Sequence, residues 1–194
     1  MAALLLRLGV SPDAVTVVGT LGVVVGALAF YPSGHLFWGT VVITCFVFSD
    51  SIDGIMARMQ GRSSSWGAFL DSTLDRFGDA AVFAGLVLWA TGDGPDADRL
   101  TAVLALASLA LGAIVPYARA RAEGVGARAD VGIMERSDRL VLTLVVTGLV
   151  GLGLPRVVLT AVLGLVAVAS VVTVLQRVLL VRRQTVDGPA RAQR

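Results

Sequence analysis

The chain has 194 residues, of which 56% are hydrophobic, and its formal net charge is only +2. Soluble domains contain about 45–50% apolar residues, so this composition excludes an ordinary soluble domain and indicates a polytopic membrane protein. Every basic side chain is an arginine. The arginines flank apolar stretches and do not form one stripe, which argues against nucleic acid as a partner. The single cysteine, Cys45, excludes a disulfide within the chain.

Six apolar stretches are long enough to cross a bilayer, which requires about 20 mostly apolar residues in a helix. In chain order they cover residues 14–31, 36–58, 67–91, 100–121, 138–154 and 156–181. A Gly-Leu-Gly-Leu-Pro run at 151–155 separates the last two, because glycine and proline favour a helix break. The sequence therefore predicts an all-α protein with six transmembrane helices in one domain, residues 1–183. A polar, disordered cytoplasmic tail is expected at 184–194.

The charges of the connecting segments predict how the chain crosses the membrane. Arginines are concentrated at 119–139 and in the tail, and two more lie at 58–62, whereas the loop at 92–99 is mainly acidic. Cytoplasmic loops of membrane proteins carry an excess of basic residues. We therefore expect an integral, multi-pass protein of the plasma membrane. Both termini, and the junction between the second and third spans, should face the cytoplasm.

Four carboxylates lie beside that junction. Asp50 and Asp53 are three residues apart in the second span, and Asp71 and Asp75 are four apart in the third, so each pair shares a helix face. Carboxylates at membrane depth are costly, and they mark a functional site by default. Oxygen ligands without accompanying His or Cys suit Mg²⁺ or Mn²⁺, and four negative charges favour two ions. A two-metal site can hold both the attacking and the leaving oxygen of a displacement at phosphorus.

The spacing from Asp50 to Asp75 is D-x2-D-G-x2-A-R-x8-G-x3-D-x3-D. It resembles the signature of the CDP-alcohol phosphotransferases, and every specified position is filled. The resemblance implies a membrane enzyme that moves a substituted phosphate from a CDP-linked donor to an alcohol and releases CMP. It also implies residue roles: one metal on Asp50, Asp53 and Asp71, a second on Asp50, Asp71 and Asp75, and a CDP pocket lined by Gly54, Ala57, Arg58 and Gly67.

Two points about this acidic group stay open in the sequence. The resemblance makes Asp75 the general base for the acceptor hydroxyl, but it could equally act mainly as a metal ligand. Asp79 continues the same helix face outside the signature, where it could support the site or serve helix packing.

A second block of residues bears on the acceptor alcohol. The segments 116–123, 132–139 and 168–177 are similar to the actinobacterial phosphatidylinositol-phosphate synthase branch of the family. That similarity implies CDP-diacylglycerol as donor and inositol 1-phosphate as acceptor, with the acceptor phosphate bound by Arg119, Arg139 and Arg177. Converging guanidinium groups near an acidic metal site would themselves favour an anionic ligand. The alternative is that these arginines are anchors at the membrane interface. Supporting ion pairs are also possible among Arg121, Arg136, Glu123 and Glu135.

Three other functions remain to be weighed against this one. A phosphatidylglycerophosphate synthase would use the same donor with glycerol 3-phosphate. A divalent cation transporter would use the acids as a pathway, and a purely structural network would pair them with Arg58, Arg62 and Arg76. The resemblance further implies a homodimer in membrane lipid. The small-residue runs at 22–26 and 148–153 could pack within or between chains.

Overall fold

The computed structural model describes residues 9, 11–59, 65–94 and 97–187, without the side chains of 49–59 and 187. The described part contains helices and no β-strand. In chain order they are α2 (Pro12–Phe30), α3 (Leu36–Met59), α4 (Ser65–Thr91), α5 (Arg99–Gly124), α6 (Arg136–Gly151), α7 (Arg156–Arg182) and the π-helical turn η1 (Arg183–Asp187). The ends of α2–α7 lie within three residues of the six predicted spans. The prediction of an all-α fold is confirmed.

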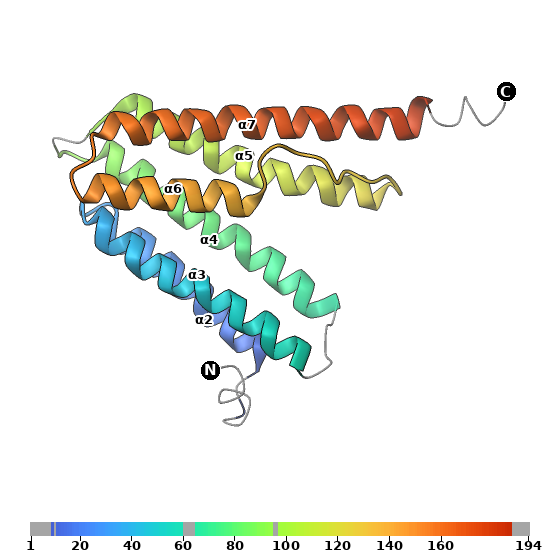
Figure 1. Cartoon of the computed structure of the whole chain (residues 1–194), viewed down its shortest axis with the longest axis horizontal. Helices are drawn as coiled ribbons and strands as arrows, with labels where there is room; N and C mark the ends of the chain where they lie inside the picture. Colours follow the sequence, from blue (N-terminus) through green and yellow to red (C-terminus); the bar gives the residue numbers. More distant parts are fainter. Residues whose placement is uncertain (1–8, 10, 60–64, 95–96, 188–194) are drawn as a thin grey trace.

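The helices pack against one another in a closed ring of contacts. α2 packs against α3 and α4, α5 packs against α4 and α7, and α6 packs against α3 and α7. The turns that join α2 to α3, α4 to α5, and α6 to α7 lie together at one end of the molecule (Figure 1). Toward the other end, α2, α3 and α4 diverge from α7 (Figure 1). The predicted site residues belong to this second end.

Three helical segments of the described part are long and apolar enough to cross a membrane, namely Pro12–Phe30, Arg99–Gly124 and Arg156–Val186. A shorter apolar stretch covers Leu36–Phe48. The first half of α4 carries acidic residues, and α6 has only 16 residues with a polar first turn. Spanning by α3, α4 and α6, and thus the full set of six transmembrane helices, stays a prediction.

Local sequence signals explain where several helices begin and end. Ser11 caps α2 by accepting a hydrogen bond from the amide of Ala14 at 3.2 Å, and proline follows at the first helical position. Asp98 caps α5 in the same way, with the amide of Thr101 at 2.9 Å. Between α6 and α7, Gly153 has a φ of +108°, a left-handed conformation that favours glycine. The predicted break at 151–155 is therefore confirmed.

Small residues let the helices approach closely inside this one chain. A Cβ at Gly85 of α4 would lie 2.7 Å from the carbonyl oxygen of Ala27 in α2. A Cβ at Gly26 would lie 3.1 Å from Val42, and one at Gly148 would lie 3.2 Å from Thr40. The runs at 22–26 and 148–153 thus make packing contacts within the chain.

The segment 125–135 is attached along the last turns of α7. The amide of Arg128 donates to the side-chain oxygen of Gln184 at 2.9 Å, and the Gln184 amide group donates back to the Arg128 carbonyl at 2.8 Å. The amide of Met134 donates to Thr173 Oγ1 at 3.3 Å. Residues 184–187, expected to begin a disordered tail, continue α7 as η1. Residues 188–194 lie outside the described part of the chain.

Candidate active site

Three acids lie one turn apart on α4, and they become more buried along the helix. Asp71 is exposed, Asp75 retains 16% of its side-chain exposure, and the residue Asp79 is 6% exposed. Gly67, in the first turn, is half-buried. The order of burial separates two accessible signature acids from a third acid that the signature does not include.

The other half of the predicted site belongs to the end of α3. The α3 backbone is helical through this region, but the side chains of Asp50, Asp53, Gly54, Ala57 and Arg58 lie outside the described residues. Among described side chains, no group of three or more His, Cys, Asp and Glu residues is arranged to hold a metal. The predicted ligand set combines both halves, so the metal site and the CDP pocket stay predictions.

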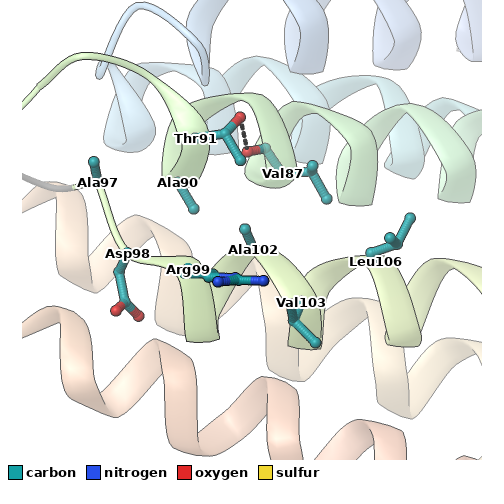
Figure 2. A pocket seen from close by; sticks show the side chains of 9 residues that line it. All are labelled: Val87, Ala90, Thr91, Ala97, Asp98, Arg99, Ala102, Val103 and Leu106. Atoms are coloured by element: carbon teal, nitrogen blue, oxygen red, sulfur yellow. Dashed lines mark hydrogen bonds between the residues drawn. The ribbon is translucent and has the colours of Figure 1, made fainter.

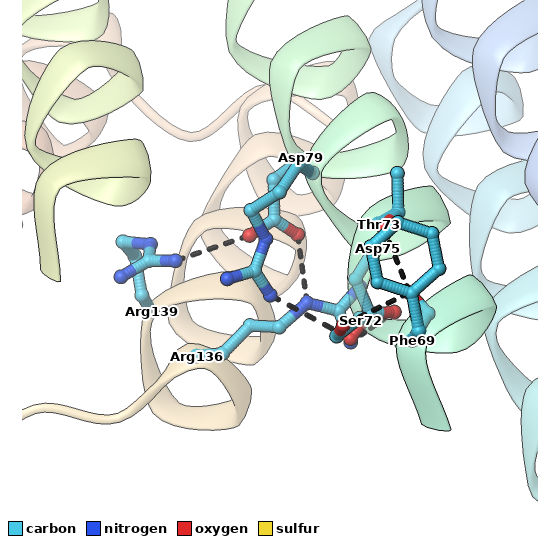
Figure 3. Close-up of polar contacts among 8 residues, drawn as sticks. Phe69, Ser72, Thr73, Asp75, Asp79, Arg136 and Arg139 are labelled. Carbon is cyan, nitrogen blue, oxygen red and sulfur yellow. Dashed lines mark hydrogen bonds and ion pairs between the residues drawn. The ribbon is translucent and has the colours of Figure 1, made fainter. Parts of the chain in front are cut away.

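Arg136, at the start of α6, bridges two of the α4 acids (Figure 3). Its Nη1 lies 2.9 Å from Asp75 Oδ1, and its Nε donates to Asp79 Oδ1 at 3.0 Å. Arg76 lies near the other oxygen of Asp75, with Nη2 3.6 Å from Oδ2. Part of an ion-paired network therefore exists at the site. Its main cation is Arg136, while Arg62 and the Arg58 side chain lie outside the described residues.

Arg139, one turn further along α6, has an exposed fraction of only 1%. Its Nη2 donates to Asp79 Oδ2 at 3.0 Å (Figure 3). Its Nε and Nη1 are buried without a hydrogen-bond partner among the described residues. The guanidinium packs against Gly112 of α5, where a Cβ would lie 3.4 Å from Nε. Arg139 is thus a buried cation with two donor nitrogens unused.

In each of the other two predicted phosphate-binding arginines, two guanidinium nitrogens already have partners. Arg119 is half exposed, with Nε 3.2 Å from Glu123 Oε1 and Nη2 2.9 Å from Asp130 Oδ1. Arg177 is 6% exposed and donates to backbone carbonyls, from Nε to Val131 at 2.9 Å and from Nη1 to Val115 at 2.5 Å.

All three arginines nevertheless meet one stretch of α5. Gly112 contacts Arg139, the carbonyl of Val115 accepts from Arg177, and Arg119 belongs to α5 itself. An arginine that anchors a helix at the membrane interface extends its charged end into water. The burial of Arg139 and Arg177 is inconsistent with that alternative. The binding of a phosphate by these residues is not tested by the contacts and stays a prediction.

A groove lies away from this site, and Figure 2 shows the side chains that line it. It runs between the end of α4 and the start of α5 and is lined mainly by apolar side chains. Its one carboxylate, Asp98, already accepts hydrogen bonds from Thr101. The groove therefore adds no reactive group to those on α4 and α6.

Comparison with known proteins identifies the class. Residues 9–133 match the CDP-alcohol phosphatidyltransferase family. The chain therefore belongs to this family, and it is a CDP-alcohol phosphotransferase of phospholipid synthesis, as the signature spacing predicts.

Within this family, the chain is similar to several phosphatidylinositol phosphate synthases. A phosphatidylinositol phosphate synthase of Streptomyces avermitilis is 53% identical over 97% of this chain and 79% of its own length. A phosphatidylinositol phosphate synthase of Cutibacterium acnes is 47% identical over 94% of this chain and 91% of its own length. The crystal structure of the Mycobacterium tuberculosis phosphatidylinositol phosphate synthase with CDP-DAG bound has 41% identity and a TM-score of 0.88, covering 93% of this chain and 91% of that one. The structure of the same enzyme in complex with manganese and citrate has a TM-score of 0.87. The match covers 93% of this chain and 86% of that one.

The contact between Asp79 and the α6 arginines was not predicted from the sequence. The available signal was the spacing of Asp79, four residues after Asp75, which indicated a shared face but no partner. An ion pair between Arg136 and a glutamate of its own region was one possibility in the sequence; in the structure Arg136 pairs with Asp75 and Asp79.

Proposed function

We propose that this chain is a phosphatidylinositol phosphate synthase. It transfers the phosphatidyl group of CDP-diacylglycerol to inositol 1-phosphate and releases CMP. The observation that carries the proposal is its similarity, over nearly the whole chain, to several synthases of this name, together with a complete signature from Asp50 to Asp75.

The carboxylate ligands on α4 support the use of a divalent metal ion. Asp71 is exposed and Asp75 is partly accessible on one face of α4, and carboxylate oxygens are the ligands that Mg²⁺ and Mn²⁺ prefer. We assign two ions, one to Asp50, Asp53 and Asp71 and one to Asp50, Asp71 and Asp75. Bound there, they would neutralise the pyrophosphate of the donor and the charge that develops on departing CMP.

The chain's own residues supply the proton transfer and the orientation. The hydroxyl oxygen of the acceptor attacks the phosphorus of the phosphatidyl group, and its proton passes to the carboxylate of Asp75. The bond between that phosphorus and the oxygen of CMP breaks, and CMP leaves with the bonding electrons. Gly54, Ala57, Arg58 and Gly67 line the pocket for the CDP group.

The acceptor phosphate is assigned to Arg119, Arg139 and Arg177. Arg139 offers two unused donor nitrogens, whereas Arg119 would exchange a carboxylate partner for the phosphate. Arg177 already donates to two carbonyl groups, so it would bind the phosphate while also holding the neighbouring backbone of this subsite. Because Arg139 is covered, inositol 1-phosphate reaches it only after the surrounding side chains move.

In the cell, we place the protein across the plasma membrane, with the active site and both termini cytoplasmic. The acyl chains of the donor then remain in the inner leaflet while the CDP group reaches the acids. We also propose that it works as a homodimer, as the family resemblance implies.

The direct test is product identification after reconstitution. Purified protein in liposomes that contain CDP-diacylglycerol is supplied with Mg²⁺ and inositol 1-phosphate, and the lipids are analysed by mass spectrometry. The proposal predicts phosphatidylinositol phosphate in a one-to-one ratio with CMP. Release of CMP without this lipid, or ion flux without CMP release, would refute it. The Asp71→Asn variant serves as the inactive control.

A further inference from the structure

Asp79 is a buried carboxylate outside the family signature, and both of its oxygens are engaged by arginines. Oδ1 accepts from Arg136 Nε and Oδ2 accepts from Arg139 Nη2, each at 3.0 Å (Figure 3). Asp71 and Asp75 are more accessible acids of the same helix face. The contacts of Asp79 therefore direct both of its oxygens toward the arginines of α6.

The two arginines reach Asp79 from a helix whose packing neighbours are α3 and α7. Arg136 and Arg139 lie three residues apart on α6, so they share a face and can meet on one carboxylate. An arginine side chain has many rotamers, and a charge-assisted hydrogen bond to a fixed carboxylate selects one of them. Asp79 thus sets the direction of the Arg139 guanidinium.

Arg139 keeps unused binding capacity in this arrangement. A guanidinium carries five N–H donors, yet within the described part of the chain only Nη2 has a partner, while Nε and Nη1 are buried without one. Buried unsatisfied donors are costly and uncommon in native proteins. One carboxylate shared by two guanidinium groups also leaves their positive charge only partly balanced. Stability alone is a weak reason to keep such a cluster, because buried ion pairs often contribute little to it.

We propose that Asp79 is a positioning residue for the acceptor phosphate. It holds the Arg139 guanidinium so that Nε and Nη1 are available to the phosphate of the acceptor. Through Arg136, which contacts both Asp79 and Asp75, the same carboxylate keeps this phosphate subsite in a fixed relation to Asp75. The inference rests on the proposed function, because Asp75 and Arg139 receive their roles there.

The test is a pair of Michaelis constants for the Asp79→Asn variant, measured by CMP release in the reconstituted enzyme. Asparagine is nearly the same size as aspartate, but it has an NH2 group in place of one carboxylate oxygen. One of the two arginines would then face a hydrogen-bond donor where it now has an acceptor. We expect the KM for inositol 1-phosphate to rise at least about tenfold, equivalent to about 1.4 kcal/mol. The KM for CDP-diacylglycerol should stay within roughly twofold of the wild-type value. The control is Asp93→Asn, an exposed acid in the loop at the opposite end of the molecule that should leave both constants unchanged.

A double-mutant cycle separates positioning from general support of the fold. If Asp79 acts through Arg139, Asp79→Asn should add nothing to the acceptor KM of an Arg139→Gln enzyme. If Asp79→Asn alone does not fold, Asp79→Glu keeps the charge, shifts the carboxylate by one methylene, and should raise the acceptor KM selectively but less. Additive effects, or equal increases in both Michaelis constants, would overturn the assignment.

The two proposals can fail separately. A wild-type enzyme that releases no CMP with inositol 1-phosphate would overturn the proposed function. A wild-type enzyme that turns over, together with an unchanged acceptor KM in Asp79→Asn, would overturn only the role of Asp79.

Discussion

At the scale of single residues, Arg139 has the lowest exposed fraction of the charged side chains that the structure describes, at 1%. Truncating one partner of a buried, hydrogen-bonded charge pair costs about 2–5 kcal/mol. We therefore expect Arg139→Ala to raise the KM for inositol 1-phosphate at least about thirtyfold, with a much smaller change for CDP-diacylglycerol. Steady-state kinetics with each substrate varied in turn would measure this. Equal effects on the two constants would argue against a phosphate-binding role.

Asp71 carries the corresponding prediction for the metal site. It is the exposed signature acid of α4, and it is assigned to both ions. We expect Asp71→Asn to lower kcat by at least about a thousandfold and to weaken Mn²⁺ binding. The substitution replaces one carboxylate oxygen by an amide nitrogen and removes the negative charge of a residue assigned to both ions. Electron paramagnetic resonance of Mn²⁺ measures the binding without turnover. Asp93→Asn, in the acidic loop at the other end, is the control and should bind Mn²⁺ like the wild type. Unchanged Mn²⁺ affinity in Asp71→Asn would contradict the ligand assignment.

The positions of the site acids on α4 could be predicted from the sequence, but the residues that contact them could not. The positions of Asp71 and Asp75 follow from spacing within one helix, which is a local property of the chain. The partners of Asp79 are 57 and 60 residues away, and they depend on how α6 lies against the rest of the fold. The role of Arg177 was likewise hidden, because its acceptors are backbone carbonyls that carry no sequence signal.

At the scale of helices, the crossing of α2 and α4 depends on Gly85. A side chain at this position would meet the Ala27 carbonyl oxygen at 2.7 Å, and backbone cannot move aside as a flexible side chain can. We expect Gly85→Ala to destabilise the protein by about 1–3 kcal/mol. Gly164→Ala is the matched control, since its nearest neighbour would be an ordinary 3.7 Å contact and alanine favours helix. In thermal unfolding measured in detergent, the midpoint temperature should be lower for Gly85→Ala and unchanged for Gly164→Ala. Equal midpoints for the two variants would show that this crossing tolerates a methyl group.

The attachment of segment 125–135 to α7 gives a second prediction at this scale. Arg177 donates to the carbonyl of Val115 in α5 and to that of Val131 in the segment, so removing it takes away a direct link between α7 and the segment. We expect Arg177→Gln to loosen the segment, so that trypsin cleaves after Arg128 at least about tenfold faster because local opening becomes easier. Thr185→Ala, which loses only a hydrogen bond within its own helix, should cleave at the wild-type rate. An unchanged rate in Arg177→Gln would mean that Gln184 and Thr173 suffice to hold the segment.

The ends of the helices were predictable because the signals that set them are local. Glycine and proline at 151–155 break the chain, and polar residues limit each apolar stretch. The continuation of α7 into η1 was not predictable from the polar composition of the tail. It is accompanied by the reciprocal hydrogen bonds between Gln184 and Arg128, which are 56 residues apart.

At the scale of the whole molecule, the orientation in the membrane can be tested with single cysteines. In a Cys45→Ser background, Gly94→Cys and Arg183→Cys place exposed thiols at the acidic loop and at the end of α7. The positive-inside rule predicts that a membrane-impermeant maleimide labels only Gly94→Cys in intact cells. Inverted vesicles should give the reverse pattern. Labelling of Arg183→Cys in intact cells would place the active site on the wrong side for a cytoplasmic donor.

In the proposed function, a CDP-alcohol phosphotransferase site is combined with arginines that select a phosphorylated inositol. The most direct measurement compares kcat/KM for CMP release with inositol 1-phosphate, glycerol 3-phosphate and free inositol, using one preparation of enzyme, CDP-diacylglycerol and Mg²⁺. We predict that inositol 1-phosphate is preferred over each of the others by at least about a hundredfold, because charge-assisted contacts to the phosphate and the fit of the ring both contribute. A preference for glycerol 3-phosphate, or equal use of free inositol, would contradict it.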